Sequence, residues 1–491
     1  MAALPLMAAA AYAQPGPREI TVVLKEDMDN LDPCNMSAAY VGNVLRQNVI
    51  EPLTVLDPED SSPQPHLATS WEALPDGVWR FKLREGVKFH DGADFNAEAV
   101  AKSFVRMKSA NLTCLDPAKA RIEALGVNIV DPYTIELKPE PPRVLLPVLL
   151  SFIGITSPNK DDAAPSREPI GTGPFAFQSW DNDRIVLDRF EEYWGEKPEA
   201  ERVNYTWRSE SSLRAAMVDV GEADLALDIA PQDATKDSDK AFLSGDTTRL
   251  RMVMLPPLDD IRVRKAMNYA FDREALLGTL LSEHAVPATN YFLPKTVGYN
   301  PDLKVFPYDL EEAKKLIEEA RADGVPVDAE IRLVGRIGLY PNGSEVLQAM
   351  AQMWSEIGLN IRIEMIETAQ WLKLVNRPFA EERPVMLIQE QHDNNNGDAE
   401  FTMHSRFETG GRQSELSIPE LDKVLTEAKE ATGEERAQLY AEANRIVAEE
   451  VVPHVMMYHM ASFVRVGPRI SFDPSTSYAG LLRLSEVRFN D

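Results

Sequence analysis

Residues 67–104 constrain the fold more than any other part of the chain. Pro75-Asp76-Gly77 has the composition of a tight turn, because proline fixes φ, aspartate bonds to nearby backbone and glycine accepts a positive φ. Residues 78–84 then alternate apolar and cationic side chains, which is the period of a half-buried antiparallel strand. After a second turn at Asp91-Gly92, apolar residues recur at helical spacing over 96–104. The stretch predicts a hairpin packed against a helix, an arrangement common in α+β proteins.

The length and charge of the chain limit the classes of protein to which it can belong. A chain of 491 residues is too long for one compact core, so we expect two or three domains. The composition, 44% hydrophobic and 26% charged, is ordinary for a folded protein. The formal net charge is −27 at pH 7. A surface this acidic repels nucleic-acid phosphates and anionic lipid, whereas it suits cationic or zwitterionic solutes.

The N-terminal segment has the pattern of an export signal. Residues 2–13 are almost all small and apolar, end in Ala11-Tyr12-Ala13, and precede the polar residues 14–17. This is the hydrophobic region and cleavage site of a secretory signal peptide. The usual basic segment is missing, so we expect the true start to lie upstream. No later apolar run reaches about 18 residues, so we expect no membrane span in the mature chain.

The chain has two cysteines, Cys34 and Cys114, and neither belongs to a CxxC motif or a Cys/His cluster. In an oxidising compartment the two could pair, and closing a loop of about 80 residues would stabilise the fold by about 4 kcal/mol. The alternative is two separate buried thiols.

Several further segments occur in the order of the motifs of one bacterial family. They are a Gly/Pro-rich crossing segment at 169–175, a predicted helix–turn–strand feature around 221–224, and the helical run 262–273. Together with residues 67–104, this order resembles family 5 extracellular solute-binding proteins, the oligopeptide-, dipeptide- and nickel-binding receptors of ABC importers. The resemblance covers residues 20–491. It implies a periplasmic, monomeric receptor that captures a peptide or peptide-like solute and delivers it to membrane permease subunits. It also implies no catalysis and no cofactor.

The resemblance further implies an α/β, bilobal periplasmic-binding-protein fold (type II, cluster C) with an extra α+β subdomain in the first lobe. The two lobes would close around the solute by hinge motion. The expected boundaries are a signal-peptide remnant at 1–13, lobe I core at 19–49 and 170–258, the extra subdomain at 50–169, lobe II at 259–464, and a return to lobe I at 465–491.

The most regular helix is predicted to start after Asp259 or Asp260, either of which suits the N-cap position. Its apolar stripe consists of Val263, Ala266, Met267, Ala270 and Phe271. We expect four cationic residues to lie outside that stripe: Arg262, Arg264, Lys265 and Arg273.

Residues 389–401 are the least ordinary polar run of the chain. In peptide-binding members of the family that the chain resembles, a Gly-Asp step here places a carboxylate against the ligand's α-amino group. Gly397-Asp398 resembles that step, so Asp398 is expected to contact the ligand, with Asp393 and Asn395 nearby. Burying an ammonium requires such a charge-assisted acceptor. Ala399 replaces the usual proline, which keeps a sugar, an opine or a similar conjugate open as ligand. The alternative is a solvated Asn-rich loop.

Three further residues are candidates for ligand contact. Trp371 matches an aromatic position that flanks the cleft in the family, although a core tryptophan on a helix would give the same pattern. Asn35 and Tyr40 follow the first predicted strand and are expected to contact the ligand from the other lobe. Their alternative roles are a helix-capping group and a core-facing ring.

The histidine pattern bears on one further ligand class. His392 lies near the start of the polar run and His404 follows its end, which keeps a nickel chelate open as ligand. His454 and His459 are five residues apart in a predicted strand, so we expect them to face opposite sides. An exported hydrolase is the alternative from another class, but the chain contains no GxSxG and no HExxH motif.

Overall fold

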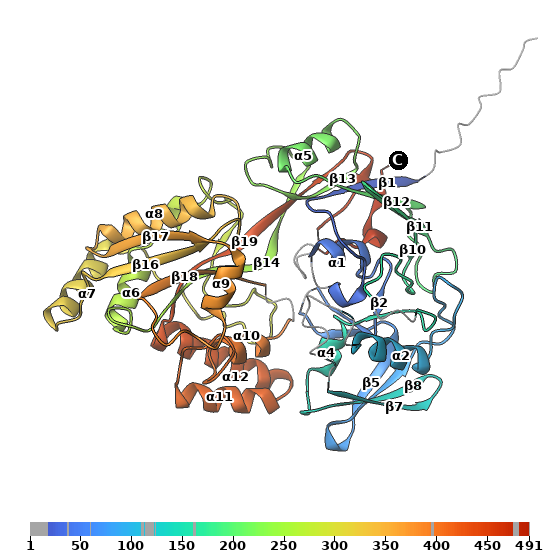
Figure 1. Cartoon of the computed structure of the whole chain (residues 1–491), viewed down its shortest axis with the longest axis horizontal. Coiled ribbons are helices and arrows are strands. Elements are labelled where there is room, and N and C mark those ends of the chain that lie inside the picture. Colours follow the sequence, from blue (N-terminus) through green and yellow to red (C-terminus); the bar gives the residue numbers. More distant parts are fainter. Residues whose placement is uncertain are drawn as a thin grey trace, which may run out of the picture.

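The computed structural model describes residues 18–36, 39–58, 60–109, 112, 122, 124–160, 164–393, 397–474 and 481–490. Figure 1 shows two lobes side by side, connected by two long strands. Within the described part of the chain, no helix has both the length and the hydrophobicity needed to cross a bilayer.

One sheet runs through both lobes, in the strand order β10-β11-β12-β1-β13-β19-β14-β18-β16-β17. In lobe I, β1 (Glu19–Leu24) lies parallel between β12 (Arg202–Trp207) and β13 (Leu225–Ile229). Two antiparallel strands, β11 (Arg184–Arg189) and β10 (Phe175–Asp181), complete that edge. The first predicted strand is therefore a central one.

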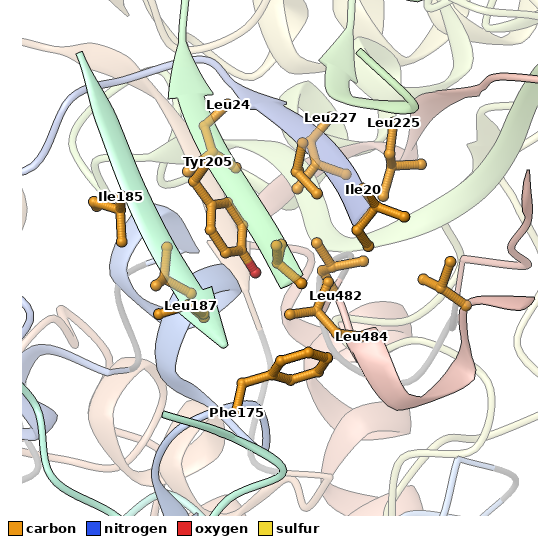
Figure 2. Close-up of a cluster of buried hydrophobic side chains, with 14 of the residues drawn as sticks. Ile20, Leu24, Phe175, Ile185, Leu187, Tyr205, Leu225, Leu227, Leu482 and Leu484 are labelled. Atoms are coloured by element: carbon orange, nitrogen blue, oxygen red, sulfur yellow. The ribbon is translucent and has the colours of Figure 1, made fainter. Parts of the chain in front are cut away.

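The core of lobe I lies against one face of these strands (Figure 2). Tyr205 is fully buried there, and its hydroxyl donates to the carbonyl of Asn43 in α1 (Ala39–Leu45) at 2.9 Å. Leu482 and Leu484, from the far end of the chain, pack into the same core. The core thus joins segments from both ends of the sequence.

Two strands connect the lobes. β14 (Asp239–Met252) and β19 (His454–Val466) pair antiparallel, from Asp239 opposite Arg465 to Arg251 opposite His454. The chain enters lobe II on β14 and leaves it on β19. A paired ribbon of this kind allows bending and twisting but keeps the lobes in register.

Lobe II continues the sheet with β18 (Met386–Asp393), β16 (Glu330–Arg336) and β17 (Asn360–Ile366). One face is covered by α6 (Ile261–Tyr269), α7 (Leu310–Ala322) and α8 (Gly343–Ser355), whose apolar sides share one core with the strands. The opposite face carries α9 (Thr368–Val375), α10 (Glu400–Arg406), α11 (Pro419–Glu430) and α12 (Gly433–Arg445).

Residues 67–104 form the predicted hairpin and helix. The hairpin is β5 (Ala68–Ala73) with β6 (Trp79–Leu83), and β8 (Thr134–Pro139) and β7 (Leu125–Asp131) extend it to a four-stranded antiparallel sheet. The helix is α2 (Ala97–Met107), whose N-cap Asn96 accepts a hydrogen bond from the amide of Ala99. This sheet and α2 share a core of their own. The extra subdomain in lobe I stays a prediction.

The predicted apolar stripe of α6 is confirmed, but the position predicted for two arginines is wrong. Asp260 caps the helix as expected, accepting from the amide of Arg262. Arg264 and Arg273, however, are only 7% and 4% exposed. Arg264 donates to the carbonyls of Leu258 and Val451, and Arg273 to that of Met456. A guanidinium has five donors, so it can be buried against carbonyl groups without a carboxylate.

The prediction that His454 and His459 face opposite sides of a strand is also wrong. A register shift in β19 places His454 opposite Arg251 and His459 opposite Thr247. Because Arg251 and Thr247 are four residues apart in a strand regularly paired with β18, they share a side, and both histidines face it. His392 of β18 also lies opposite Thr247. Three buried histidines therefore line one face of the sheet.

These histidines should make the protein sensitive to mild acid. Burial lowers the pKa of His392 and His454 well below 6.5, and it lowers that of His459 to about 4. The unfolded chain binds these protons below pH 6.5 and the folded chain does not, so the free energy of unfolding should fall as the pH drops from about 6.5. His459 alone should account for about 2 kcal/mol by pH 5. Urea unfolding at pH 7 and pH 5, repeated on His459→Gln, would measure this; an equal loss in both proteins would contradict the assignment.

Cys34 is fully buried and is not a free thiol. Cys114 lies outside the described residues, so the pairing of the two cysteines stays a prediction.

Candidate ligand-binding cleft

A cavity of about 530 Å³ lies where the two lobes meet the connecting strands. It is bordered by residues that follow the carboxyl ends of β1, β13 and β16, together with the middle of β14 and β19. Ligands of α/β proteins bind at such ends, because the loops after neighbouring parallel strands converge there. The lining includes Lys25, Glu26, Tyr40, Asn43, Asp228, Ser244, Asp246, Tyr340 and Gln391.

Two of the carboxylates that line the cavity have raised pKa values. Asp228 lies near the end of β13 in lobe I, in the left-handed region at φ 53°, and Asp246 lies on β14. Asp228 is open to the cleft, yet the surrounding protein desolvates it and raises its pKa. Burial also raises the pKa of Asp246, and the negative charge of Asp228 raises it further. Asp228 is exposed to the cleft and Asp246 is half-buried, and a cation near two partly desolvated carboxylates would stabilise their charged forms.

Arg214 supports Asp228 from behind. Its side chain is 1% exposed and donates to the carbonyls of Arg208 and Ser209, both at 2.8 Å, and to those of Leu227 and Asp228. Burial without an ion pair lowers the pKa of this guanidinium. Arg214 therefore fixes the backbone that carries Asp228, and four of its five N–H donors are used in doing so.

Arg336 is a cation that interacts electrostatically with Asp246, although it is not among the residues that line the cavity. It ends β16, and its guanidinium carbon lies 5.1 Å from the ring centroid of Trp371. Burial lowers its pKa, while the charge of Asp246 acts in the opposite direction. Within the described part of the chain its guanidinium forms no hydrogen bond or ion pair. A half-buried guanidinium of this kind is suited to a carboxylate.

Trp371 acts as the platform for Arg336. It is 7% exposed, and its indole N–H donates to the carbonyl of Gln389 at 2.7 Å. It belongs to a small core with α9 and β18. Trp371 is not among the residues that line the cavity, and its ring faces the guanidinium of Arg336.

Asp398 lies apart from this cavity. It is 2% exposed, and its oxygens accept from Nε and Nη2 of Arg436 at 2.8 and 2.9 Å and from the amide of Glu400 at 2.8 Å. The side chain anchors the 397–400 turn to α12, a use of the carboxylate that differs from the expected ligand contact. Sequence spacing could not reveal Arg436, which is 38 residues away.

Of the other residues predicted to contact the ligand, Tyr40 lines the cavity. Asn35 is 2% exposed, and its amide donates to Oδ1 of Asn30 at 3.2 Å, in a 3₁₀ turn behind α1. Asp393 ends β18 opposite Asp246, and Asn395 lies outside the described residues.

Sequence analysis missed Asp228, Asp246 and Arg336. Asp228 and Arg336 lie at or near the ends of apolar strands, and that position was the available signal, whereas Asp246 lies in the middle of β14. Among the residues that the structure describes, no group of three or more His, Cys, Asp or Glu side chains is arranged to hold a metal ion.

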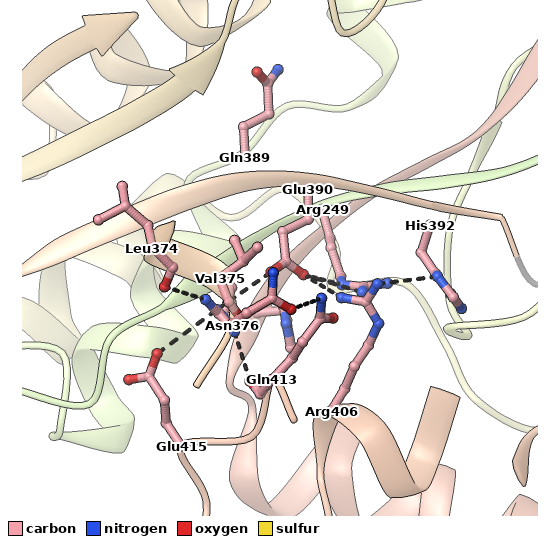
Figure 3. Close-up of polar contacts among 12 residues, drawn as sticks. Arg249, Leu374, Val375, Asn376, Gln389, Glu390, His392, Arg406, Gln413 and Glu415 are labelled. Atoms are coloured by element: carbon pink, nitrogen blue, oxygen red, sulfur yellow. Dashed lines mark hydrogen bonds and ion pairs between the residues drawn. The ribbon is translucent and has the colours of Figure 1, made fainter. Parts of the chain in front are cut away.

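A buried ion-pair network lies on the α9–α12 side of the same strands (Figure 3). Glu390 is 1% exposed and pairs with Arg249, Arg251 and Arg406 at 3.1, 3.4 and 3.0 Å. Burial opposes ionisation of Glu390, but the three arginines together hold its pKa at about 2. Arg406 also donates to Nδ1 of His392. The network ties β14, β18 and α10 together behind the cleft.

Comparison with known proteins decides the family. The model of bacterial extracellular solute-binding proteins, family 5, matches residues 62–411. The chain belongs to this family. The resemblance stated from the sequence is thereby confirmed.

Two relatives of this family 5 protein match most of its length. Di/tripeptide-binding protein 2 of Pseudomonas aeruginosa (strain UCBPP-PA14) is 27% identical over 93% of this chain and 92% of its own. The dipeptide-binding protein of Escherichia coli (strain K12) is 29% identical over 81% of each chain.

Solved structures confirm the bilobal binding-protein fold. HbpA2 from Haemophilus parasuis has a TM-score of 0.83 at 22% identity, over 96% of this chain and 100% of its own. A dipeptide-binding protein from Pseudoalteromonas sp. SM9913, in complex with Met-Leu, has a TM-score of 0.74 at 18% identity, again over 96% and 100%.

Proposed function

We propose that this chain is the periplasmic substrate-binding component of an ABC importer and that it captures a di- or tripeptide, or a peptide-like zwitterion. One observation carries the proposal: Asp228 and Asp246 line the cleft, and the guanidinium of Arg336, which forms no hydrogen bond or ion pair with any described residue, is close enough to interact electrostatically with Asp246. The peptide-binding names of relatives that match most of the chain support the same ligand class. Delivery to membrane permease subunits follows from the family, and capture by hinge closure follows from the two connecting strands.

The charges define how such a ligand would lie. Its α-ammonium would sit between the two carboxylates, whose desolvation makes a cation favourable there. Its α-carboxylate would accept from Arg336, which Trp371 holds in place. Expulsion of water on closure would strengthen both contacts. The hydroxyls of Tyr40 and Tyr340 are available for the peptide group between the two ends.

Capped peptides test the proposal directly. Calorimetric titration should show Ala-Ala binding, while N-acetyl-Ala-Ala and Ala-Ala-amide should each bind about 100-fold more weakly, because each lacks one charge. Equal affinity for the capped and free peptides would overturn the zwitterion assignment. Native mass spectrometry of freshly purified protein, with sugars, opines and nickel chelates as further titrants, would reveal a different solute class.

Asp246→Asn should separate binding from stability. The pKa of Asp246 is raised in the folded protein, so its ionised form destabilises the fold at pH 7, and the neutral amide should raise the melting temperature. The same change removes a ligand for the ammonium, so the affinity for Ala-Ala should fall at least about 10-fold. Asp328→Asn is the matched control, since that carboxylate is 79% exposed in a surface ion pair. A loss of both stability and affinity in Asp246→Asn would indicate a structural role instead.

A further inference from the structure

Lobe II contains a second cavity, of about 290 Å³, that shares no lining residue with the cleft. It lies between α6, the segments 288–291 and 303–307, and the start of β19. Part of its wall is apolar, formed by Tyr269, Leu303 and Phe306 among others. The family assignment and the proposed function leave this cavity unexplained.

The wall of the cavity contains two rare backbone conformations. Residues Ile446–Val451 form a π-helix, and the next residue, Val452, has φ 49°. A left-handed conformation costs a β-branched residue about 1–2 kcal/mol. Ala448, Glu449 and Val452 all line the cavity. Such segments persist where a site requires them, so this wall is a reason to ask what the cavity binds.

An uncompensated cation lies in the wall. Arg273 is 4% exposed, and its partners are neutral oxygens: the carbonyls of Asn268, Phe271, Phe306 and Met456 and the side chain of Asn268. Within the described residues no carboxylate lies within ion-pair distance of it. Its positive charge therefore acts on the cavity without a counter-ion.

Two further polar groups on the cavity wall have no partner among the described residues; one is a lysine ammonium, and the other is a histidine nitrogen that can donate when Tyr291 donates to the other ring nitrogen. The half-buried Lys265 forms no hydrogen bond or ion pair with any described residue. His454 is 4% exposed; its Nδ1 lies 3.1 Å from the hydroxyl of Tyr291, and its Nε2 has no partner. The carboxylate on this wall, that of Glu449, lies 3.6 Å from Arg445. The cavity is thus rich in donors and poor in acceptors.

The surroundings add to the positive field. Arg249, Arg251 and Arg406 share Glu390 in the network of Figure 3, and all three act electrostatically on His454. Burying this much positive charge beside an apolar wall favours a ligand with one anionic end and one apolar end.

We propose that this cavity binds a small organic carboxylate. The carboxylate would approach Lys265 within the field of Arg273, and the apolar part would pack against Tyr269, Leu303 and Phe306. The inference is independent of the peptide assignment, because it concerns different residues in the interior of one lobe.

The probe for this site is 4-bromobenzoate. Calorimetry should detect binding at about 10 mM or below, and a soaked crystal should show the anomalous bromine signal inside the cavity. Lys265→Gln should weaken binding at least about 10-fold; because Lys265 is half-buried and unpaired, this variant should fold. Arg336→Ala, which alters the cleft, should leave 4-bromobenzoate binding unchanged.

Three results would overturn the proposal. The first is no binding to folded protein at about 10 mM. The second is binding that Arg336→Ala abolishes and Lys265→Gln leaves intact, because the probe would then occupy the cleft. The third is inorganic phosphate or chloride binding as tightly as 4-bromobenzoate, which would leave no role for the apolar wall. The bromine position gives an independent answer if Lys265→Gln is unstable.

Discussion

Arg336→Ala should weaken the binding of a dipeptide such as Ala-Ala by about 100-fold, or about 3 kcal/mol, with little change in stability. The guanidinium stacks on Trp371 and forms no ion pair with any described residue, so its removal leaves no buried carboxylate unpaired. The affinity of Arg336→Lys should lie between those of the wild type and Arg336→Ala, because lysine keeps the charge but loses the planar fork that matches a carboxylate. Isothermal titration calorimetry would measure all three proteins.

A comparison with capped peptide assigns the contact. In Arg336→Ala, Ala-Ala and Ala-Ala-amide should bind with similar affinity, because the partner of the carboxylate is gone. Arg362→Ala is the matched control: Arg362 is 65% exposed on neighbouring β17, and its loss should leave affinity unchanged. Wild-type affinity in Arg336→Ala would remove this residue from the site.

Glu390→Ala should reduce the free energy of unfolding by about 3–5 kcal/mol, because it leaves three buried arginines without their shared carboxylate. Acid should act in the same direction. Since the folded pKa of Glu390 is about 2 and the ordinary value is 4.5, its contribution is complete above pH 4.5 and is lost as the pH falls toward 2. Chemical denaturation at pH 7 would measure the variant.

Two further variants distinguish the effect of this buried network on stability from that of exposed surface charges. Glu330→Ala removes a carboxylate that is 50% exposed in a pair with Arg362, and should cost less than about 0.5 kcal/mol. Adding Arg249→Met to Glu390→Ala should restore part of the loss, because it removes one of the uncompensated charges. A loss below about 1 kcal/mol in Glu390→Ala would show that the three arginines are stabilised by other means.

Local sequence patterns predicted the local structure well. The alternation in 78–84 and the helical spacing over 96–104 became β6 and α2, and Asp260 caps α6 as expected. These features depend on neighbours within a few residues, which periodicity and capping chemistry describe. The order of several such motifs then indicated the family.

The sequence did not reveal which residues far apart in the chain would contact each other. Asp398 is paired with Arg436, and Arg273 is held by carbonyls from Asn268 to Met456, so the roles of both depend on residues that only the fold brings together. For the same reason sequence analysis did not identify Asp228 and Arg336 as site residues, since they come from different lobes. For His454 and His459, one register shift reversed the predicted facing, because strand parity is lost at an irregularity.

The neighbouring course of β14 and β19 means that lobe II is a contiguous insertion, whose two attachment points are hydrogen-bonded to each other. Lobe II is therefore encoded by a single uninterrupted stretch of the gene, for residues from about 253 to 453. If two relatives exchanged that stretch, only the pairing of the two connecting strands, β14 and β19, would have to match. New solute preferences could then arise by recombination in a single step, without redesign of the lobe that holds both chain ends.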